Sequence, residues 1–427
     1  MPDTVIDTYN DHMERLKGSI PGWDSARENA LDRLRNVGMP TTRGEDWRYS
    51  DIKALRNNAF GLMTMPKRNP DLAEALTDVS ARLVFINGRI HEELSDLGDL
   101  WQAASVRPIG NHLMANADRV SELKLGTDGV NLLNTALMRD GFVISIPAGV
   151  EIDDPIEIIH LTSEADNASA HTRHLIEMGE GASATILERF VGDETNYWNN
   201  SILQARITEG ATLNHVRLQE EGANATHTAT AFVNVGAGGN YHATNISLGG
   251  SLSRFEARVR LLVDEANATV DGVALAGTGD SHDMLVHIDH RMPNTTSDQI
   301  FRTVADARGK SSFQGKVTVA TDAQHVNADQ SFKALLLDRT AEANAKPELE
   351  IFADDVKCSH GATVGELDEK ALFYLTSRGI DPTTARQMLV EAFTDDAFDR
   401  TGNDALAEAI RELVADWMIN HTGSNND

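Results

Sequence analysis

The sequence predicts a mainly β protein in which a β-helix core is flanked by helical N-terminal and C-terminal regions. Apolar and polar residues alternate along the middle of the chain, glycine-bearing turns return there at a nearly fixed interval, and both ends show helical periodicity. A chain of 427 residues also exceeds the usual size of a single core. We therefore expect a helical region at 1–80, a β-helix core at 81–365 and a second helical region at 366–427.

The first region has the pattern of amphipathic helices. Apolar residues recur at helical spacing through 25–40. Ser25, followed three residues later by Glu28, has the pattern of a capping box, and Gly38 is placed to end the helix. Further along, Trp47 stands among charged residues, and we expect it to anchor this loop on the next domain.

The middle region alternates with period two, as half-buried strands do. In FEARVRL and in FQGKVTVA, every second residue is apolar or glycine. The inward-facing residues predicted from these two segments are Phe255, Ala257, Val259, Leu261, Phe313, Gly315, Val317 and Val319. Strands of this kind bury one face and expose the other.

The turns of the middle region repeat with steps of 29, 28 and 28 residues, at Gly181, Gly210, Gly238 and Ala266. A turn that returns at such a period is typical of a solenoid, in which each unit buries its face against its neighbours. Because each unit contains strands, a β-helix is the natural solution. Coincidence among glycine-rich turns is the alternative, and four regular instances argue against it.

The last region predicts three short amphipathic helices. Asp368 is placed to cap the first, which ends near Gly379, and Asp381 with Pro382 begins the second. The third is expected over 403–419. Two roles are open for these helices: they can cap the open end of the solenoid, or they can offer a groove or ridge to a partner.

The composition limits the cellular location and the classes of partner to be expected for this chain. A single cysteine excludes an internal disulfide framework, and the charged N-terminal segment lacks the apolar run of a secretory signal. No uncharged apolar stretch is long enough to span a membrane. We therefore expect a cytoplasmic location. The net charge of −27 argues against nucleic acid and anionic lipid as partners.

The candidate chemistry centres on that single cysteine, Cys358, and on His360 two residues later. Residues two apart on a strand point the same way, so a thiolate and an imidazole would lie side by side as ligands for iron or zinc. Spacing alone favours a structural role, because free cysteine usually packs as a small hydrophobe. Asp354 and Asp355, just upstream, are expected to be surface acids of a turn.

Other motifs argue against an enzyme. The pairs His171 with His174 and His287 with His290 are each three residues apart, which places the two rings on opposite faces of a strand. We interpret these histidines as surface or core-packing residues rather than zinc ligands. The sequence has no Walker motif, nucleophile elbow or dinucleotide-binding glycine motif. A scaffold without catalytic residues of its own is the better interpretation.

Long stretches of the chain resemble the SufB/SufD family of iron–sulfur cluster assembly proteins. The most specific is 341–380, which contains KCSHGATVGELDEKALFYL, and the segments 43–52, 140–158 and 309–338 add to it. The resemblance implies a right-handed parallel β-helix between helical regions. Chains of the SufB type carry further cysteines, so this sequence is more similar to the SufD type.

The resemblance also implies partners and a cargo. A SufD-type chain pairs with a SufB-type paralogue and binds the SufC-type ABC ATPase through its C-terminal helices. Cys358 and His360 are then expected at the seam, as ligands of a transient iron–sulfur cluster shared with the partner subunit. No cofactor is expected to bind tightly to the isolated chain, which could instead form a homodimer.

Three alternatives stay open. One is a SufB-like scaffold that works as a homodimer, and another is a stand-alone metal-binding β-helix protein that uses the histidines. A catalytic β-helix acting on polysaccharides is the third, and the lack of a secretion signal argues against it.

Overall fold

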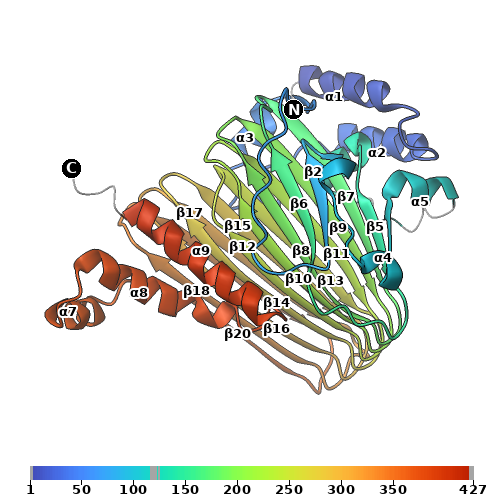
Figure 1. The fold of residues 1–427 in the computed structure, drawn as a ribbon. Coiled ribbons are helices and arrows are strands. Elements are labelled where there is room, and N and C mark those ends of the chain that lie inside the picture. The colour runs from blue at the N-terminus through green and yellow to red at the C-terminus, as the bar shows by residue number, and fades with distance from the viewer. Residues whose placement is uncertain (1–2, 116–122, 124–125, 423–427) are drawn as a thin grey trace.

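The computed structural model describes all residues except 1–2, 116–122, 124–125 and 423–427. The first two residues of the predicted N-terminal region and the last five of the predicted C-terminal region thus lie outside the described residues. The protein is mainly β, a solenoid of about eight turns with helices at the two ends of the chain (Figure 1). The predicted fold class is confirmed.

Two ten-stranded sheets form the walls of the solenoid. Sheet A contains, in spatial order, β19 (Glu342–Ile351), β17 (Lys310–Val319), β15 (Ser281–His290), β13 (Leu252–Leu261), β11 (Thr226–Val235), β9 (Tyr197–Ile207), β7 (Ala168–Met178), β5 (Phe142–Ile146) and β4 (Ser105–Pro108), with β1 (Gly61–Leu62) beside β7. Sheet B contains β20 (Lys357–Glu366), β18 (Asn327–Leu336), β16 (Thr296–Ala305), β14 (Asn267–Ala276), β12 (Asn240–Ser247), β10 (Thr212–Glu220), β8 (Ser183–Gly192), β6 (Ile156–Thr162), β2 (Ala81–Ile86) and β3 (Arg89–Ile90).

Consecutive strands from β5 to β20 alternate between the two sheets, and each pairs in parallel with the strand two places along the chain. The core lies between the sheets. Phe255, Ala257, Val259 and Leu261 all belong to it, as the alternation predicts. Phe301 and Phe332 are register partners in sheet B, and both rings contact Phe313 of sheet A across the core, with centroids 4.4 and 5.4 Å apart.

The repeated turns place one residue in the left-handed conformation in each unit. Gly181, Gly210 and Gly238 have φ values of 63°, 62° and 56°. In the next unit this position is Glu265 (φ 59°) rather than the predicted Ala266, and Asn294 (φ 56°) and His325 (φ 62°) continue the series. The predicted period was therefore right but the fourth turn was assigned one residue too late, because a non-glycine residue occupies the strained position.

Helices precede and interrupt the first strands. They are α1 (Asp3–Leu16), α2 (Asp24–Val37), η1 (Glu45–Trp47), α3 (Lys53–Asn57), η2 (Glu92–Leu94), α4 (Leu100–Ala103), α5 (Ile109–Ala115) and α6 (Gly129–Leu137). The sequence did not predict α4, α5 and α6, which lie within the segment assigned to the β-helix. The helix α6 packs against α2 and is buried along its whole length.

The capping box predicted for α2 is wrong. The helix begins at Asp24, one residue before Ser25, and no side chain caps it. The Asp24 carboxylate instead accepts hydrogen bonds from the Gly18 N–H at 3.0 and 3.1 Å. The other end is as predicted, because Gly38 has a φ of 71° and its N–H donates to the Leu34 carbonyl at 2.7 Å.

The aromatic anchor predicted at Trp47 is confirmed. Its ring is buried, and the guanidinium of Arg254 on β13 lies 3.9 Å from the ring centroid. The same guanidinium donates to the Asp46 carbonyl at 2.8 Å and to the Ser50 hydroxyl at 3.1 Å. These contacts fix the loop after α2 on the outer face of sheet A.

The C-terminal region forms α7 (Glu369–Ser377), α8 (Pro382–Thr394), η4 (Asp395–Ala397) and α9 (Asp404–Thr422). Both predicted caps are present: the side chains of Asp368 and Asp381 accept backbone N–H bonds at the starts of α7 and α8. None of the described helices combines the length and apolar character that a membrane span requires.

The C-terminal helices do not cap the open end of the solenoid. The helices α8 and α9 lie along the outer face of sheet B, whereas α7 projects away from it (Figure 1). Leu406, Ile410 and Val414 of α9 pack in one cluster with residues of β8, β10, β12, β14 and β16. Arg400, between the helices, binds Asp271 and Asp298 of that face at 2.7 Å. Within the described residues, these helices thus cover the outer face of sheet B and reach the end of the solenoid only at the last residues of β20. A cap over the whole end, the first of the two roles left open for these helices, is not formed by the described residues.

Candidate functional site at the open end of the solenoid

The two ends of the solenoid finish differently. At the first end, sheet B closes with β3, antiparallel to β2, and sheet A closes with β4, antiparallel to β5. Leu100 and Ala104 are buried in the core there. At the other end, β19 and β20 each keep ten residues and pair in parallel with one neighbour only. We call β19 and β20 the open end.

The open end shows apolar side chains to solvent. Val364 stacks in register on the buried Ala334, so it points into the core, yet it is 49% exposed. Ile351, which continues the inner row of sheet A, is 39% exposed, and Phe352 next to it is 62% exposed. Edge strands and apolar surface of this kind form an interface more often than a free surface.

Cys358 and His360 lie on β20, on the inner face of this last turn. In the ladder Cys358 lies opposite Ala328, and His360 lies opposite Gln330. Ala328 and Gln330 are buried, whereas Cys358 is half-buried and His360 is exposed. The two candidate ligands therefore point the same way, as their spacing predicts, and both are within reach of a second subunit.

The surroundings hold the thiol in its neutral form. Burial raises the pKa of Cys358 above its ordinary value of 9.0, and the negative charge of Asp329 raises it further. A raised pKa leaves little of the reactive thiolate at neutral pH. A metal ion changes this balance, because coordination displaces the thiol proton.

The acids near Cys358 are already engaged or lie in solvent. Asp355 pairs with His325 of the adjacent turn at 3.0 Å, and both side chains are mostly exposed. Asp329 accepts a hydrogen bond from the Ser359 hydroxyl on the outer face of the ladder. Asp354 is exposed. The interpretation of Asp354 and Asp355 as surface turn acids agrees with this geometry.

A family model described as "SUF system FeS cluster assembly, SufBD core domain" matches residues 160–393, more than half of the chain. A second, "SufBD protein N-terminal region", matches residues 2–158. The chain belongs to the SufBD family. The resemblance found in the sequence is thereby confirmed.

Relatives from three organisms match this SufBD chain over most of its length. An iron–sulfur cluster assembly SufBD family protein of Synechocystis is 32% identical, over 91% of this chain and 90% of that protein. The iron–sulfur cluster assembly protein SufD of Escherichia coli K12 is 29% identical over 89% of each. The chloroplastic protein ABCI7 of Arabidopsis thaliana is 30% identical over 96% of this chain and 89% of that protein.

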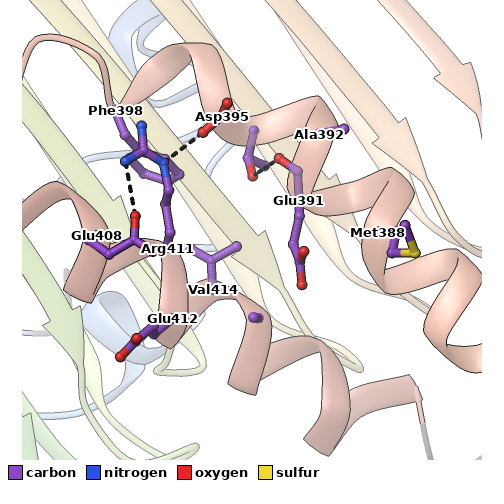
Figure 2. A pocket seen from close by; sticks show the side chains of 11 residues that line it. Met388, Glu391, Ala392, Asp395, Phe398, Glu408, Arg411, Glu412 and Val414 are labelled. Carbon is purple, nitrogen blue, oxygen red and sulfur yellow. Dashed lines mark hydrogen bonds and ion pairs between the residues drawn. The ribbon is translucent and has the colours of Figure 1, made fainter.

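This SufBD chain also has a groove on its C-terminal helices, between α8 and α9 (Figure 2). Its volume is about 440 Å³, and its lining combines an apolar floor with acidic rims. The lining residues are Met388, Glu391, Ala392, Thr394, Asp395, Phe398, Glu408, Arg411, Glu412, Val414 and Ala415. Arg411 is held over the groove by Asp395 at 2.6 Å and Glu408 at 3.6 Å.

The helix before this groove carries exposed aromatic residues. Phe373 and Tyr374 on α7 are 73% and 55% exposed, and the Arg378 guanidinium lies 4.7 Å from the Tyr374 ring centroid. Only Leu367 and Asp368 separate α7 from β20. The strand that carries Cys358 therefore continues almost directly into the helix that presents these aromatic rings.

The histidine pairs considered as zinc ligands lie mostly in the interior of this SufBD fold. His171 packs against Trp198 on one side of sheet A, while His174 points to the opposite side, into the core. Both ring nitrogens of the buried His290 are within 2.9 Å of hydroxyl groups, and His287 is half-buried. The interpretation of these pairs as non-chelating agrees with the structure.

One cluster was not predicted from the sequence: His174 meets His160 and Glu188 inside the solenoid. The three come from β6, β7 and β8, and no local motif contains them. A signal was nevertheless present: they are spaced by 14 and 14 residues, half of the repeat. This spacing marks equivalent positions in successive half-turns.

Proposed function

We propose that this SufBD chain is a non-catalytic scaffold subunit that pairs through its open end with a SufB-type paralogue and contributes Cys358 and His360 to a nascent iron–sulfur cluster. The observation that carries the proposal is the position of the two side chains on the inner face of an uncovered edge strand. A partner that extends the two sheets would bring its own side chains directly opposite them.

The chemistry of the pair suits a shared and temporary cargo. A thiolate is a soft anionic ligand and an imidazole a borderline one, and both are suited to iron. Two ligands cannot saturate a cluster, so the rest must come from the partner subunit or from the incoming sulfide. A cluster that is incompletely held by protein stays transferable, as assembly requires.

The ligand proposal is tested by replacing each residue in the complete complex. Cys358→Ala and His360→Ala are each expected to lower cluster loading about tenfold or more, measured by iron and sulfide content and by visible absorption. His325→Ala is the matched control, since His325 is also an exposed histidine at this end but is paired with Asp355. Normal loading in both ligand variants would refute the proposal.

The C-terminal helices are proposed to bind the SufC-type ATPase. The resemblance implies this site, and the exposed rings of Phe373 and Tyr374 with the groove between α8 and α9 support it. Exposed aromatic residues beside an apolar groove are typical of binding hot spots. The acidic rim of the groove favours a basic surface on the partner.

The docking proposal is tested by a pair of variants with opposite effects. Phe373→Ala is expected to weaken ATPase binding about tenfold or more while leaving SufB-type pairing unchanged. Phe352→Ala, an exposed phenylalanine at the open end, is expected to do the reverse. Binding is measured by titration calorimetry with each partner. Loss of both interactions in either variant would contradict separate docking surfaces.

The short link between β20 and α7 gives the ATPase a route to the cluster site. Approach of two ATPase subunits on ATP binding displaces α7, and the displacement reaches β20 through Leu367 and Asp368. The ATP-bound state is thereby coupled to a rearranged seam in which Cys358 and His360 accept iron and sulfur. The ATPase supplies the differential contacts that such a shift requires.

Two alternative functions differ from the proposed one in the partner or metal that the chain would bind. A SufB-like homodimeric scaffold would load clusters without a second paralogue, whereas the proposed heterodimer would not. A stand-alone metal protein would hold metal as a monomer through its histidines. Elemental analysis and sedimentation of the isolated chain distinguish these outcomes from the proposal, in which the isolated chain pairs with itself and holds no cluster.

A further inference from the structure

Inside the solenoid, a group of three side chains has the donor set of a metal site. One nitrogen each from His160 and His174 and one carboxylate oxygen from Glu188 lie within 4.8 Å of one another. All three residues are at least 95% buried. Within the described part of the chain, this is the group of histidine, cysteine or acidic residues whose geometry could hold an ion.

Each of the three residues has a buried polar atom without a partner. These atoms are Nε2 of His160, Nε2 of His174 and Oε1 of Glu188. The remaining oxygen of Glu188 lies 2.8 Å from Nε2 of His215, and Nδ1 of His174 accepts from the Phe142 N–H at 3.3 Å. Unpartnered polar atoms in a protein core are rare, and one such atom on each of three neighbouring residues indicates a missing ligand.

The carboxylates of Glu188 and Glu221 both act on the buried guanidinium of Arg217, beside the cluster. The guanidinium of Arg217, which can only donate, contacts Nε2 of His227, so this ring carries its proton on Nδ1, 2.5 Å from Glu221. His227 is therefore a neutral ring between a cation and a carboxylate.

His215 fixes one oxygen of the Glu188 carboxylate. Its Nε2 lies 2.8 Å from that oxygen, and its Nδ1 lies 2.9 Å from the hydroxyl of Tyr241. The other carboxylate oxygen of Glu188, Oε1, is left without a partner.

We infer that His160, His174 and Glu188 form a buried binding site for a divalent first-row transition-metal ion, Zn²⁺ or Fe²⁺. Two imidazole nitrogens and one carboxylate oxygen are the donors of known His–His–Glu zinc and His–His–carboxylate iron sites. Bonds of about 2.1 Å around such an ion place its ligand atoms roughly 3.4 Å apart. Each side chain reaches this geometry by moving less than about 1 Å.

The rings are held in place for this role. His160 is stacked between Phe85 and Phe190, with centroid distances of 4.7 and 4.5 Å. Burial lowers the pKa of His174 to about 4, so its ring is neutral at pH 7, as a ligand must be. A neutral His174 that held the ion through Nε2 would carry its proton on Nδ1, and the 3.3 Å hydrogen bond from the Phe142 N–H would be given up.

The test uses the full chain without a polyhistidine tag, in a Cys358→Ala and His360→Ala background that removes the surface ligands. Because the site is buried, the chain is produced in medium with Zn²⁺ or Co²⁺ and, separately, refolded with each ion and with Fe²⁺ under anaerobic conditions. We expect one equivalent of metal to survive dialysis against a chelator. The Co²⁺ form should show visible d–d bands without sulfur charge transfer.

Two variants and one control make the result specific. His160→Phe keeps the aromatic stack but removes a ligand, and Glu188→Gln keeps the shape of the side chain. In both variants the bound metal is expected to fall about tenfold or more relative to the parent chain. His290→Gln, a buried histidine whose two nitrogens are already bonded, should retain as much as the parent. Metal should raise the melting temperature of the parent but not of His160→Phe.

The inference is overturned if the parent chain holds no metal after both production and refolding with the three ions. It is equally overturned if folded His160→Phe and Glu188→Gln, checked by circular dichroism, retain metal like the parent. The site is independent of the proposed cluster ligands, because the background chain lacks them. Failure of cluster loading therefore leaves this inference unaffected, and failure here leaves the proposed function unaffected.

Discussion

At one end of the solenoid the sheets finish in the short antiparallel strands β3 and β4. At the other end β19 and β20 keep ten residues each, and no strand of the described residues lies beyond them. Leu100 fills the core at the closed end, while Val364, in an inward-facing position at the open end, remains half exposed. The same stacking of strands thus ends in a buried core at one end and in exposed apolar side chains at the other. The first end is closed by added strands and a short helix, and the described residues place no such strand beyond β20.

Because the two ends differ in burial, truncating a side chain to alanine should lower the free energy of unfolding more at the closed end than at the open end. Leu100→Ala is expected to lower the free energy of unfolding by about 2–5 kcal/mol. The Leu100 side chain is only 3% exposed, so its removal leaves a cavity in the core. The measurement is the urea midpoint and slope, followed by circular dichroism.

Val364→Ala is the control for this prediction. Its side chain already contacts solvent in the isolated chain, so the free energy of unfolding of the monomer should change by less than about 0.5 kcal/mol. Equal losses in the two variants would show that the open end is as tightly packed as the closed end.

The second prediction concerns the reactivity of Cys358. Because burial and Asp329 raise its pKa above 9.0, the alkylation rate should increase about tenfold per pH unit from pH 7 to pH 9. Iodoacetamide labelling followed by mass spectrometry measures this rate without ambiguity, since Cys358 is the single cysteine. Asp329→Asn should shift the profile to lower pH, and a rate already constant at pH 7 would contradict the prediction.

The third prediction tests the open end as an interface. Val364→Lys places an ammonium group on the inner row of β20, where a paired subunit would have to bury it. Pairing with a SufB-type chain, and self-association of the isolated chain, should weaken about tenfold or more, which corresponds to about 1.4 kcal/mol. Sedimentation equilibrium gives the association constants, and Met388→Lys in the groove between α8 and α9 serves as the control.

The smallest expected effect is that of Ser359→Ala. Ser359 is exposed, and its hydroxyl donates to Asp329 across the ladder. Loss of this bond should change the free energy of unfolding by less than about 0.5 kcal/mol, measured by thermal denaturation. A larger loss would mean that the end strand contributes more to the stability of the solenoid than its exposure implies.

The features that the sequence predicted correctly depend on local geometry. Side-chain direction in a strand alternates with period two, so Phe255 and Ala257 could be assigned to the core and Cys358 and His360 to one face. The caps at Asp368 and Asp381 are likewise decided within three residues. Predictions of this kind need no knowledge of the rest of the chain.

The features that were missed depend on contacts between residues far apart in the chain, or on a non-glycine residue in a strained backbone conformation. Glu265 takes a left-handed conformation that glycine takes in the preceding turns, so composition alone could not mark it. The position of α9 is decided by Arg400 and a cluster on sheet B, not by the amphipathic pattern of the helix itself. The meeting of His160, His174 and Glu188 depends on the register of three strands.

The dependence of each strand on its neighbours has a consequence for motion. In a stacked array, stability passes from one unit to the next, and a terminal unit has a neighbour on one side only. Local unfolding therefore starts at β20, whose ladder joins β18 alone, and its amide protons should exchange faster than those of β10 or β12. Cys358 and His360 thus belong to the segment that can detach and re-form while the remainder of the solenoid stays folded.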